Sequence, residues 1–568
     1  MASSTAPQQE TAVVKSRPKF LTGKRRRKTR EALLAYGLIL PAFIIIFTFG
    51  LFPLAFSVYQ SSLKGLNKIV GTYDGLGNYI KAIDNLAYVL GFWLAIVFIY
   101  LGIKAILGIR KTAKENSEGF WIWAIPALVT AVAMALFVRF FFTLLPEFLG
   151  IPAKVPKGQS LTREMAIQYF GEAWQLEKIQ TYFWVAMLFI GIAIIILYLV
   201  IRYAARSARN GNYFAGFLQA FLLFIGAAAL TWLTWTEIQR AYATALENGE
   251  SLDLWAQIIT ISAGFFLLIL SYFLWRNASD RDSTLKILLR FIAAIALAVA
   301  GWVLIAELPR IIAAGNKDWW QGLQVTVYFA LFTIPMQFVL SLTLATILFQ
   351  NLRGTTWFRM FFFLPYIAPL VGTAAAFRII FSGRANALIN SVIVSLGFEP
   401  LGWLNEPTGI FQMMAGSNID LPAWISGPSL ALITIILYNV WTYVGFDIVI
   451  FLAGLGSISK ELYEAASIDG SGRWSQFRHI TLPLLSPTIY FLMLLAVIGT
   501  FKAFNRIYVM RTGAALGTTD TASVVIFEAF NRDTRYGYAS ALAIMLLIII
   551  VILTVVNNRV AEKRVFYG

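Results

Sequence analysis

The chain has 568 residues, of which 59% are hydrophobic and 13% are charged, and its formal net charge at pH 7 is +17. Soluble domains are typically about 45–50% apolar and about 25% charged, so this composition excludes a globular enzyme and favours a helical protein with several membrane spans. With no cysteine and a single histidine, the sequence also excludes disulfides, thiolate metal sites and a histidine-based metal cluster or triad.

The segment 1–31 predicts a basic tail on the cytoplasmic side of a membrane. Residues 1–22 are mostly small and polar, a composition typical of disorder. Lys24–Arg30 form a basic cluster immediately before an apolar run at about 33–58. A cluster in that position favours attachment to anionic membrane lipid over nucleic-acid binding. The apolar run is too long for a signal peptide, so we expect it to remain as the first span.

Eleven further apolar runs predict additional spans. Six of them lie at about 87–109, 119–145, 182–204, 213–236, 255–274 and 285–308. Five follow at about 321–349, 357–381, 428–455, 484–505 and 537–558. The first six predict three helical hairpins, because each successive pair is joined by a short basic link, at 110–114, 202–209 or 276–281. The similar position and charge of these links indicate a threefold repeat of one hairpin.

The distribution of charge predicts the orientation. Membrane proteins concentrate Lys and Arg in short cytoplasmic loops. With about twelve spans, both termini lie in the cytoplasm, together with the three basic links, Arg353 and the basic C-terminal segment. The loops on the other side are expected at about 59–86, 146–181, 237–254, 309–320, 382–427 and 506–536. Orientation therefore explains the positive charge, and no nucleic-acid partner is expected.

One polar stretch, Ser457–Pro487, lies between two long apolar runs and predicts a short helix–Gly–helix elbow at the membrane surface. Ser459 suits a helix N-cap, and Glu461 falls in the first turn near the positive end of the helix dipole. Gly470 can end this helix in a left-handed conformation. Leu482-Pro483 then opens the next apolar run, where the missing N–H of proline costs nothing.

The elbow carries a known motif. Its residues match the EAA pattern, EAA-x3-G-x9-I-x-LP, at every fixed position, and these are Glu464, Ala465, Ala466, Gly470, Ile480, Leu482 and Pro483. This motif marks the cytoplasmic coupling loop of importer-type ABC transporter permeases, and the flanking sequence resembles the sugar-importing class, the maltose and glycerol-phosphate type. The resemblance implies an all-α, multi-pass protein of the inner or plasma membrane with a type I permease core. The apolar runs bring the expected total to about twelve transmembrane helices.

The resemblance also implies an organisation of the chain. The segment GTYDGLGNYIKAI, which ends at Ile83, resembles the piece that follows the first span in sugar permeases, but its usual continuation appears only from Asn316. The expected parts are a cytoplasmic tail at 1–31, a first core span and outer segment at 32–83, an inserted region of about six transmembrane helices at 84–315, and a permease core at 316–568 with the EAA loop at 457–487.

The partners implied by the resemblance are a second permease subunit, two ATPase subunits and an extracytoplasmic substrate-binding protein, with membrane lipid around the spans. ATP and Mg²⁺ would bind to the ATPase, since this chain has no G-x4-G-K-[ST] phosphate loop. The chain is thus expected to be a non-catalytic permease subunit without a cofactor of its own.

Residues of the elbow would couple the permease to the ATPase. By resemblance, Glu464 is the charged contact, Ala465 and Ala466 form a close-packing surface, and Gly470 makes the turn. Arg473 and Arg478 are predicted either to pair with acidic residues of the ATPase or to anchor the elbow at the membrane surface.

A substrate path is predicted in the spans that flank the elbow. Polar residues inside spans are costly and indicate function by default. Asn439, Tyr443 and Asp447 share a face at i, i+4 and i+8, and sugars bind to polar groups combined with aromatic faces. The other candidates are Trp441, Phe504 and Asn505. The alternative interpretation is helix–helix hydrogen bonding and interfacial anchoring.

Two other classes of protein remain as alternatives. An ion-coupled secondary transporter would need buried acidic residues and inverted repeats, and Asp447 is nearly alone in that role. A membrane-embedded transferase would need a cluster of Asp, His or Arg at a membrane face, and the scattered acidic residues do not supply it.

Overall fold

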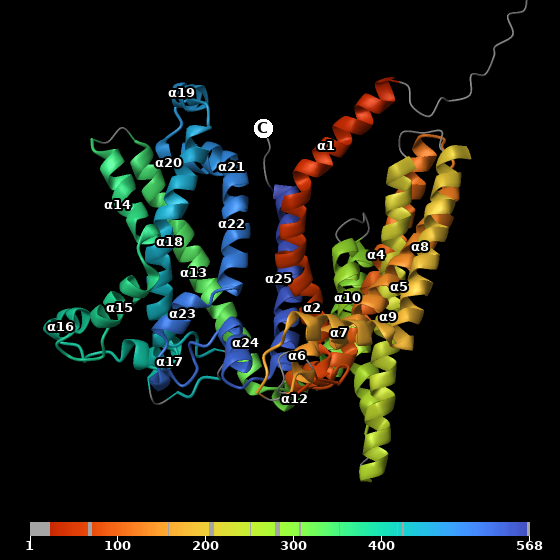
Figure 1. Ribbon diagram of the computed structural model, residues 1–568. Coiled ribbons are helices and arrows are strands. Elements are labelled where there is room, and N and C mark those ends of the chain that lie inside the picture. The colour runs from red at the N-terminus through yellow and green to blue at the C-terminus, as the bar shows by residue number, and fades with distance from the viewer. Residues whose placement is uncertain are drawn as a thin grey trace, which may run out of the picture. The chain divides into compact units, whose positions relative to one another are not determined.

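A computed structural model describes residues 23–65, 71–156, 158–203, 210–249, 252–278, 284–305, 308–350, 353–416, 419–422 and 425–564 (Figure 1). The fold is helical, as predicted, with one two-stranded ribbon. The chain divides into two units, residues 1–57 and 58–568. Much of the second and third basic links, at 202–209 and 276–281, lies outside the described residues.

The described residues of the first unit, 23–57, form a long helix that is apolar after its basic start. Helix α1 (Gly23–Ile46) continues through a π-helical turn, η1 (Phe47–Leu51), into α2 (Phe52–Ser61). The span predicted at 33–58 falls within a helical stretch, Arg30–Ser61, that is long and apolar enough to cross a membrane. Its side chains from Arg30 to Leu51 are exposed, for example Leu38 at 82%. Exposed apolar side chains along most of a span are suited to contact with lipid.

The second unit begins with a small outer segment that is tied together by one asparagine. Strand β1 (Leu63–Lys64) pairs antiparallel with β2 (Thr72–Tyr73), and α3 (Gly77–Ile83) follows. The buried amide of Asn78 donates to the carbonyls of Ser61 and Leu63, at 2.9 and 2.8 Å. These two bonds hold the ribbon against the start of α3.

The inserted region consists of long helices with short pieces between them. These are α4 (Leu86–Glu115), η2 (Trp121–Trp123), α5 (Ala124–Leu149), α6 (Ile151–Lys154), α7 (Arg163–Gln175), α8 (Glu177–Tyr203), α9 (Asn210–Asn248), α10 (Leu254–Ala278), α11 (Thr284–Ile305) and α12 (Leu308–Ala314). Helix α9 runs well beyond the predicted boundary at 236.

The extension of α9 joins the inserted region to the outer segment. Glu237, which was expected in a loop, is buried on α9 and accepts from Arg240 at 2.9 Å. A Cβ built on Gly75, which has φ +53°, would lie 2.1 Å from the carboxylate of Glu237. Arg240 in turn lies 5.7 Å from the ring centre of Tyr73. Only glycine at position 75 permits this close contact.

The predicted hairpin pairing is wrong for two of the three helix pairs. Among the described residues, α4 packs along α9 instead of α5, and α5 packs along both α8 and α9, so that α9 lies between α4 and α5. Only α10 and α11 pack together as consecutive helices. The threefold hairpin repeat is therefore not present in the packing. Short links permit neighbouring helices to pair, but side-chain fit decides which faces meet.

Small residues explain these pairings. Gly91 and Gly102 on α4 face Thr234 and Phe224 on α9, and a Cβ at either glycine would approach these side chains to 2.5 Å. Between α10 and α11, Gly264 and Gly301 oppose each other's backbone, since a Cβ on Gly301 would lie 2.8 Å from the carbonyl oxygen of Gly264. Close approach through small residues is the common mode of helix association in membranes.

The α4–α9 pairing predicts a specific cross-link. A Cβ built on Gly91 lies 3.5 Å from the Cβ of Thr234, within the range of about 3.5–4.5 Å for a disulfide. We expect the double variant Gly91→Cys/Thr234→Cys to form a disulfide on mild oxidation, measured as loss of maleimide labelling. The natural chain has no cysteine, so there is no background. The matched pair Gly91→Cys/Val138→Cys joins α4 to α5 and should stay reduced. A disulfide that forms only in this second pair would contradict the α4–α9 pairing and support the α4–α5 hairpin predicted from the sequence.

The permease core contains the remaining helices. These are α13 (Lys317–Phe349), α14 (Thr355–Ile367), α15 (Leu370–Ile380), α16 (Leu388–Ser395), η3 (Trp403–Asn405), α17 (Ile410–Ala415), α18 (Leu430–Gly456), α19 (Lys460–Ile468), α20 (Arg473–Gln476), η4 (Phe477–Thr481), α21 (Leu482–Leu484), α22 (Ser486–Phe501), α23 (Asn505–Met510), η5 (Gly513–Ala515), α24 (Ala522–Asn531) and α25 (Tyr536–Arg564). In Figure 1, α19 lies near one end of α18 and α22, whereas α23 and α24 lie near the other.

Each of the twelve predicted spans has a helical counterpart. The described residues contain nine helices long and apolar enough to cross a membrane, or eleven if each of two bent pairs is one span, and α11 holds a shorter apolar helix at Leu289–Ile305. The all-α membrane fold class is therefore confirmed. One predicted span, 357–381, is bent by 97° between α14 and α15. Ala368 is extended there (φ −62°, ψ 145°), because Pro369 disfavours a helical conformation in the preceding residue.

Helix α18 is the centre of the core. It packs against α13 and α14, and its side chains Tyr438, Ile448 and Phe451 are fully buried. At Gly445 the backbone of α14 passes so close that a Cβ would lie 1.8 Å from the carbonyl oxygen of Phe362. This contact fixes the face that α18 turns toward α14, and with it the direction of the polar residues on the helix.

Candidate functional site

The elbow forms as its sequence predicts. Ser459 caps α19 by accepting from the amide of Glu461 at 3.3 Å. Gly470 ends the helix at φ +78°, and the amide of Ser471 donates to the carbonyl of Ala466 at 2.9 Å. A non-glycine residue in this left-handed conformation would be strained. The elbow is therefore a defined helix–turn–helix.

Hydrogen bonds hold the two arms of the elbow together. The hydroxyls of Tyr463 and Thr481 lie 2.9 Å apart, and the amide of Gln476 donates to the hydroxyl of Ser467 at 2.9 Å. Each of these bonds joins α19 to the segment from α20 to η4, so the two arms of the elbow are tied to each other.

The predicted coupling residues lie mostly on the surface of the elbow. Glu464, Ala465, Arg473 and Arg478 are exposed, and within the described part of the chain none of the three charged side chains forms an ion pair. Gly470, Leu482 and Pro483 are also exposed, whereas Ala466 and Ile480 are half-buried. Ile468 and Trp474 add exposed apolar area, at 86% and 72%. This surface combines charge, small residues and apolar side chains.

A polar cavity of about 110 Å³ lies inside the core between α13, α18, α22 and α23. Asn439, Tyr443 and Asp447 line it from one face of α18, as their spacing predicts. Phe446 adds an aromatic ring to the lining. This grouping of amide, phenol, carboxylate and aromatic ring is suited to a polyhydroxylated ligand.

Two lining residues were not singled out in the sequence. The side chain of Gln337 on α13 donates to Asp447 Oδ2 at 2.6 Å. Arg506 on α23 donates from Nη1 to the Asn439 side-chain oxygen at 3.1 Å and from Nη2 to the Tyr443 hydroxyl at 2.5 Å. Two features of the sequence could have indicated them. Gln337 is a polar residue within an apolar run, and Arg506 is a charged residue directly after the candidate Asn505.

The other three path candidates lie away from the lining of this cavity. Trp441 projects from a different face of α18, and its ring centre is 5.1 Å from that of Phe377 on α15. Phe504 packs on Phe527 of α24 at 4.6 Å. Asn505 is exposed at the start of α23. Trp441 is two positions from Asn439, and residues two apart in a helix lie on different faces. No local sequence pattern indicated that Phe504 packs against α24.

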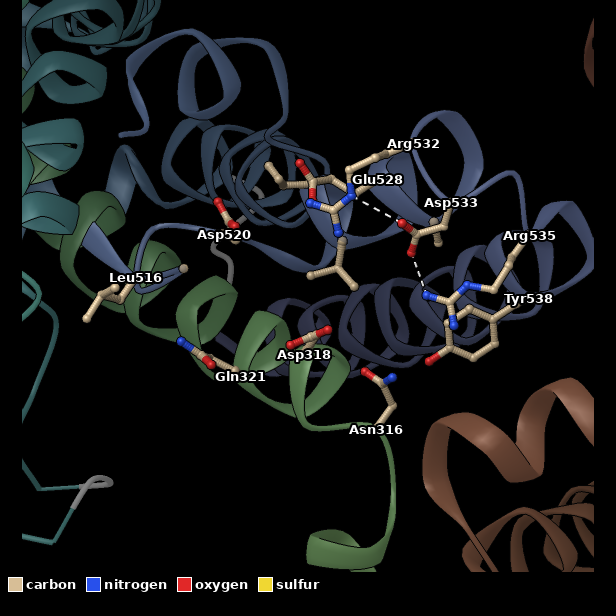
Figure 2. Close-up of a pocket in the computed structure, with 14 residues that line it drawn as sticks. Asn316, Asp318, Gln321, Leu516, Asp520, Glu528, Arg532, Asp533, Arg535 and Tyr538 are labelled. Atoms are coloured by element: carbon tan, nitrogen blue, oxygen red, sulfur yellow. Dashed lines mark hydrogen bonds and ion pairs between the residues drawn. The ribbon is translucent and has the colours of Figure 1, made fainter. Parts of the chain in front are cut away.

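A second, charged pocket of about 220 Å³ lies at the other end of the core, where the charge rule places the outer face. Figure 2 shows Asn316, Asp318 and Gln321 of the start of α13 on one side of it, and Asp533 between the side chains of Arg532 and Arg535 on the other. The sequence did not predict this pocket, because its residues come from segments 200 positions apart.

Ion pairs neutralise the arginines around this pocket. Arg511 pairs with Glu528 and, at 3.5 Å, with Asp520, and Arg535 pairs with Asp533 at 2.5 Å. Burial raises the pKa of Asp520, whereas the hydrogen bond from Arg535 holds the pKa of Asp533 below its usual value. Every one of these arginines therefore has a carboxylate partner.

Comparisons with known proteins identify the family. Residues 308–566 match the family model of the binding-protein-dependent transport system inner membrane component. The probable ABC transporter permease protein YesP of Bacillus subtilis is 32% identical over 257 residues, covering 44% of this chain and 75% of that protein. The lactose transport system permease protein LacF of Rhizobium radiobacter is 30% identical, covering 43% and 76%. The chain belongs to this family.

A further relative of the permease is the trehalose/maltose transport system permease protein MalF of Thermococcus litoralis, 29% identical over 45% of the permease and 78% of the relative. A solved bacterial alginate ABC transporter is 18% identical, with a TM-score of 0.38, over 59% of the permease and 96% of that chain, a likeness too weak to carry an argument.

The resemblance drawn from the EAA motif is thus confirmed, and so is the predicted multi-pass location in the inner membrane. The permease is a transmembrane subunit of an ABC importer. The elbow and the polar cavity both fall within the matched residues. The roles of their individual side chains stay predictions.

Proposed function

We propose that this permease serves an ATP-driven importer for a carbohydrate, together with a second permease subunit, two ATPase subunits and an extracytoplasmic substrate-binding protein. Its relatives include permeases named for lactose, for trehalose and maltose, and for arabinooligosaccharides. ATP and Mg²⁺ would be bound by the ATPase subunits, and the permease itself would hold no cofactor.

One structural observation supports the coupling mechanism above all. The helix that enters the elbow, α18, carries Asn439, Tyr443 and Asp447, and the chain that leaves it through α22 leads to Arg506 on α23. Both sides of the cavity are therefore connected directly to the elbow. A displacement of the elbow by a partner would change the separation of Arg506 from the α18 face, and so open or close the cavity.

The elbow would seat on the ATPase through its exposed surface. Glu464 would make a charged contact, while Ala465 would let another backbone approach closely. Arg473 and Arg478 are free to pair with acidic residues of the ATPase. ATP binding and hydrolysis would supply the force, and the bonds between α19 and the following segment would transmit it.

Co-purification tests this assignment. The tagged permease is isolated from its own membranes in mild detergent, and its partners are identified by mass spectrometry. We expect an ATPase and a second permease with an EAA motif, and ATP hydrolysis by the isolated assembly. A permease that purifies alone and still drives uptake in membrane vesicles without ATP would overturn the proposal in favour of an ion-coupled secondary transporter.

A further inference from the structure

Arg506 is a cation at the polar cavity with only neutral partners. Its guanidinium donates to the amide oxygen of Asn439 and to the hydroxyl of Tyr443, and lies 4.1 Å from the ring centre of Tyr443. Its Nε is buried and has no hydrogen-bond partner within the described residues. The Nε–H is therefore among the guanidinium donors that the described residues leave unused.

The nearest acidic residue of the cavity is already engaged. Asp447 accepts from Gln337 at 2.6 Å and forms no ion pair with Arg506. Across the described residues, no carboxylate lies within ion-pair distance of Arg506. Arg511, only five positions away, is held by Asp520 and Glu528. The fold thus neutralises the arginine of the outer loop and leaves the arginine of the cavity without a counter-charge.

A charge inside a membrane protein is costly and is normally paired. An unpaired arginine is tolerated where it meets a charged ligand. Guanidinium presents its donors in a planar fork that fits a carboxylate or a phosphate, and such charge-assisted bonds are about twice as strong as neutral ones. The rings of Tyr443 and Phe446, which both line the cavity, would support the apolar face of a sugar.

We propose that Arg506 is the specificity-determining residue for an acidic sugar, one that carries a carboxylate or a phosphate group. This inference rests on the proposed carbohydrate-import function. The guanidinium binds the acidic group of the substrate in the cavity, Asn439 and Tyr443 hold the guanidinium in place, and Asp447 with Gln337 meets the hydroxyl groups.

Uptake of matched sugars tests the proposal in cells that hold the complete transporter. The probes are radiolabelled galacturonic acid oligomers and sugar phosphates, each beside the neutral sugar of the same length, and a permease-deleted strain gives the background. We expect permease-dependent uptake of acidic members only. Uptake of the galacturonic acid oligomers would identify the acidic group of the substrate as a carboxylate, and uptake of the sugar phosphates would identify it as a phosphate.

Variants connect the selectivity to the residue. Arg506→Gln should reduce acidic-sugar uptake by at least about thirtyfold, the lower end of what losing one partner of a charged pair costs. Arg506→Lys should keep a larger share, since it keeps the charge and loses the planar fork. Lys502→Gln removes an exposed charge outside the cavity lining and should leave uptake unchanged. Recovery of the ATPase with each variant shows that it assembles.

Two results would overturn the proposal. Permease-dependent uptake of a neutral sugar, unaffected in Arg506→Gln, would mean that the counter-charge comes from another subunit, and it would leave the carbohydrate function standing. No permease-dependent uptake of any sugar, from cells in which the ATPase still co-purifies, would overturn the carbohydrate function together with this inference.

Discussion

Replacing Glu464 by lysine should reduce ATP-dependent uptake by about a hundredfold or more while leaving the permease folded. Glu464 is exposed on α19 and has no ion-pair partner in the described chain. Its substitution should therefore change the stability of the permease by no more than about 0.5 kcal/mol. A reversed charge in a protein interface, by contrast, can cost several kcal/mol. Uptake and recovery of the ATPase are measured on the same cells.

A matched control places the effect in the elbow. Glu562→Lys reverses another exposed negative charge, near the cytoplasmic end of α25 and outside the elbow. It should leave both uptake and co-purification of the ATPase unchanged. Normal uptake by the Glu464→Lys variant would contradict the coupling role, because the proposed contact could not survive the charge reversal. Equal losses in both variants would point to a general effect of net charge.

The second large effect is expected at the crossing of α14 and α18. In Gly445→Ala the added methyl group would lie 1.8 Å from the carbonyl oxygen of Phe362 and 3.0 Å from the Cα of Phe363. Backbone cannot rotate away as a side chain can, so the helices must move apart. We expect a loss of about 3 kcal/mol or more in stability, measured as a lower unfolding temperature in detergent.

The same helix supplies the control. Gly456 ends α18 with no atom within 4 Å of a built Cβ. Alanine is favoured over glycine in a helix by up to about 1 kcal/mol, so Gly456→Ala should be neutral or stabilising. Gly445→Ala should thus lower the unfolding temperature, whereas Gly456→Ala should leave it unchanged or raise it. A Gly445→Ala variant as stable as the natural chain would contradict the close crossing.

Local patterns in the sequence were enough to predict the membrane-spanning helices and the elbow. The apolar runs predicted where the spans lie, and the EAA positions together with Ser459 and Gly470 predicted a capped helix ending at a left-handed turn. The spacing of Asn439, Tyr443 and Asp447 placed them on one face. These features depend on residues within a few turns of one another, where helix period, capping and glycine conformation decide the result.

The tertiary structure alone decided which helices meet. Apolar helices in a membrane have no hydrophobic preference among their neighbours, so small residues and polar contacts determine the pairing. That is why α4 pairs with α9 through Gly91 and Gly102, against the predicted hairpin. It is also why the cavity could not be completed from the sequence. Arg506 reaches Tyr443 across 63 positions and Gln337 reaches Asp447 across 110, and only packing brings them together.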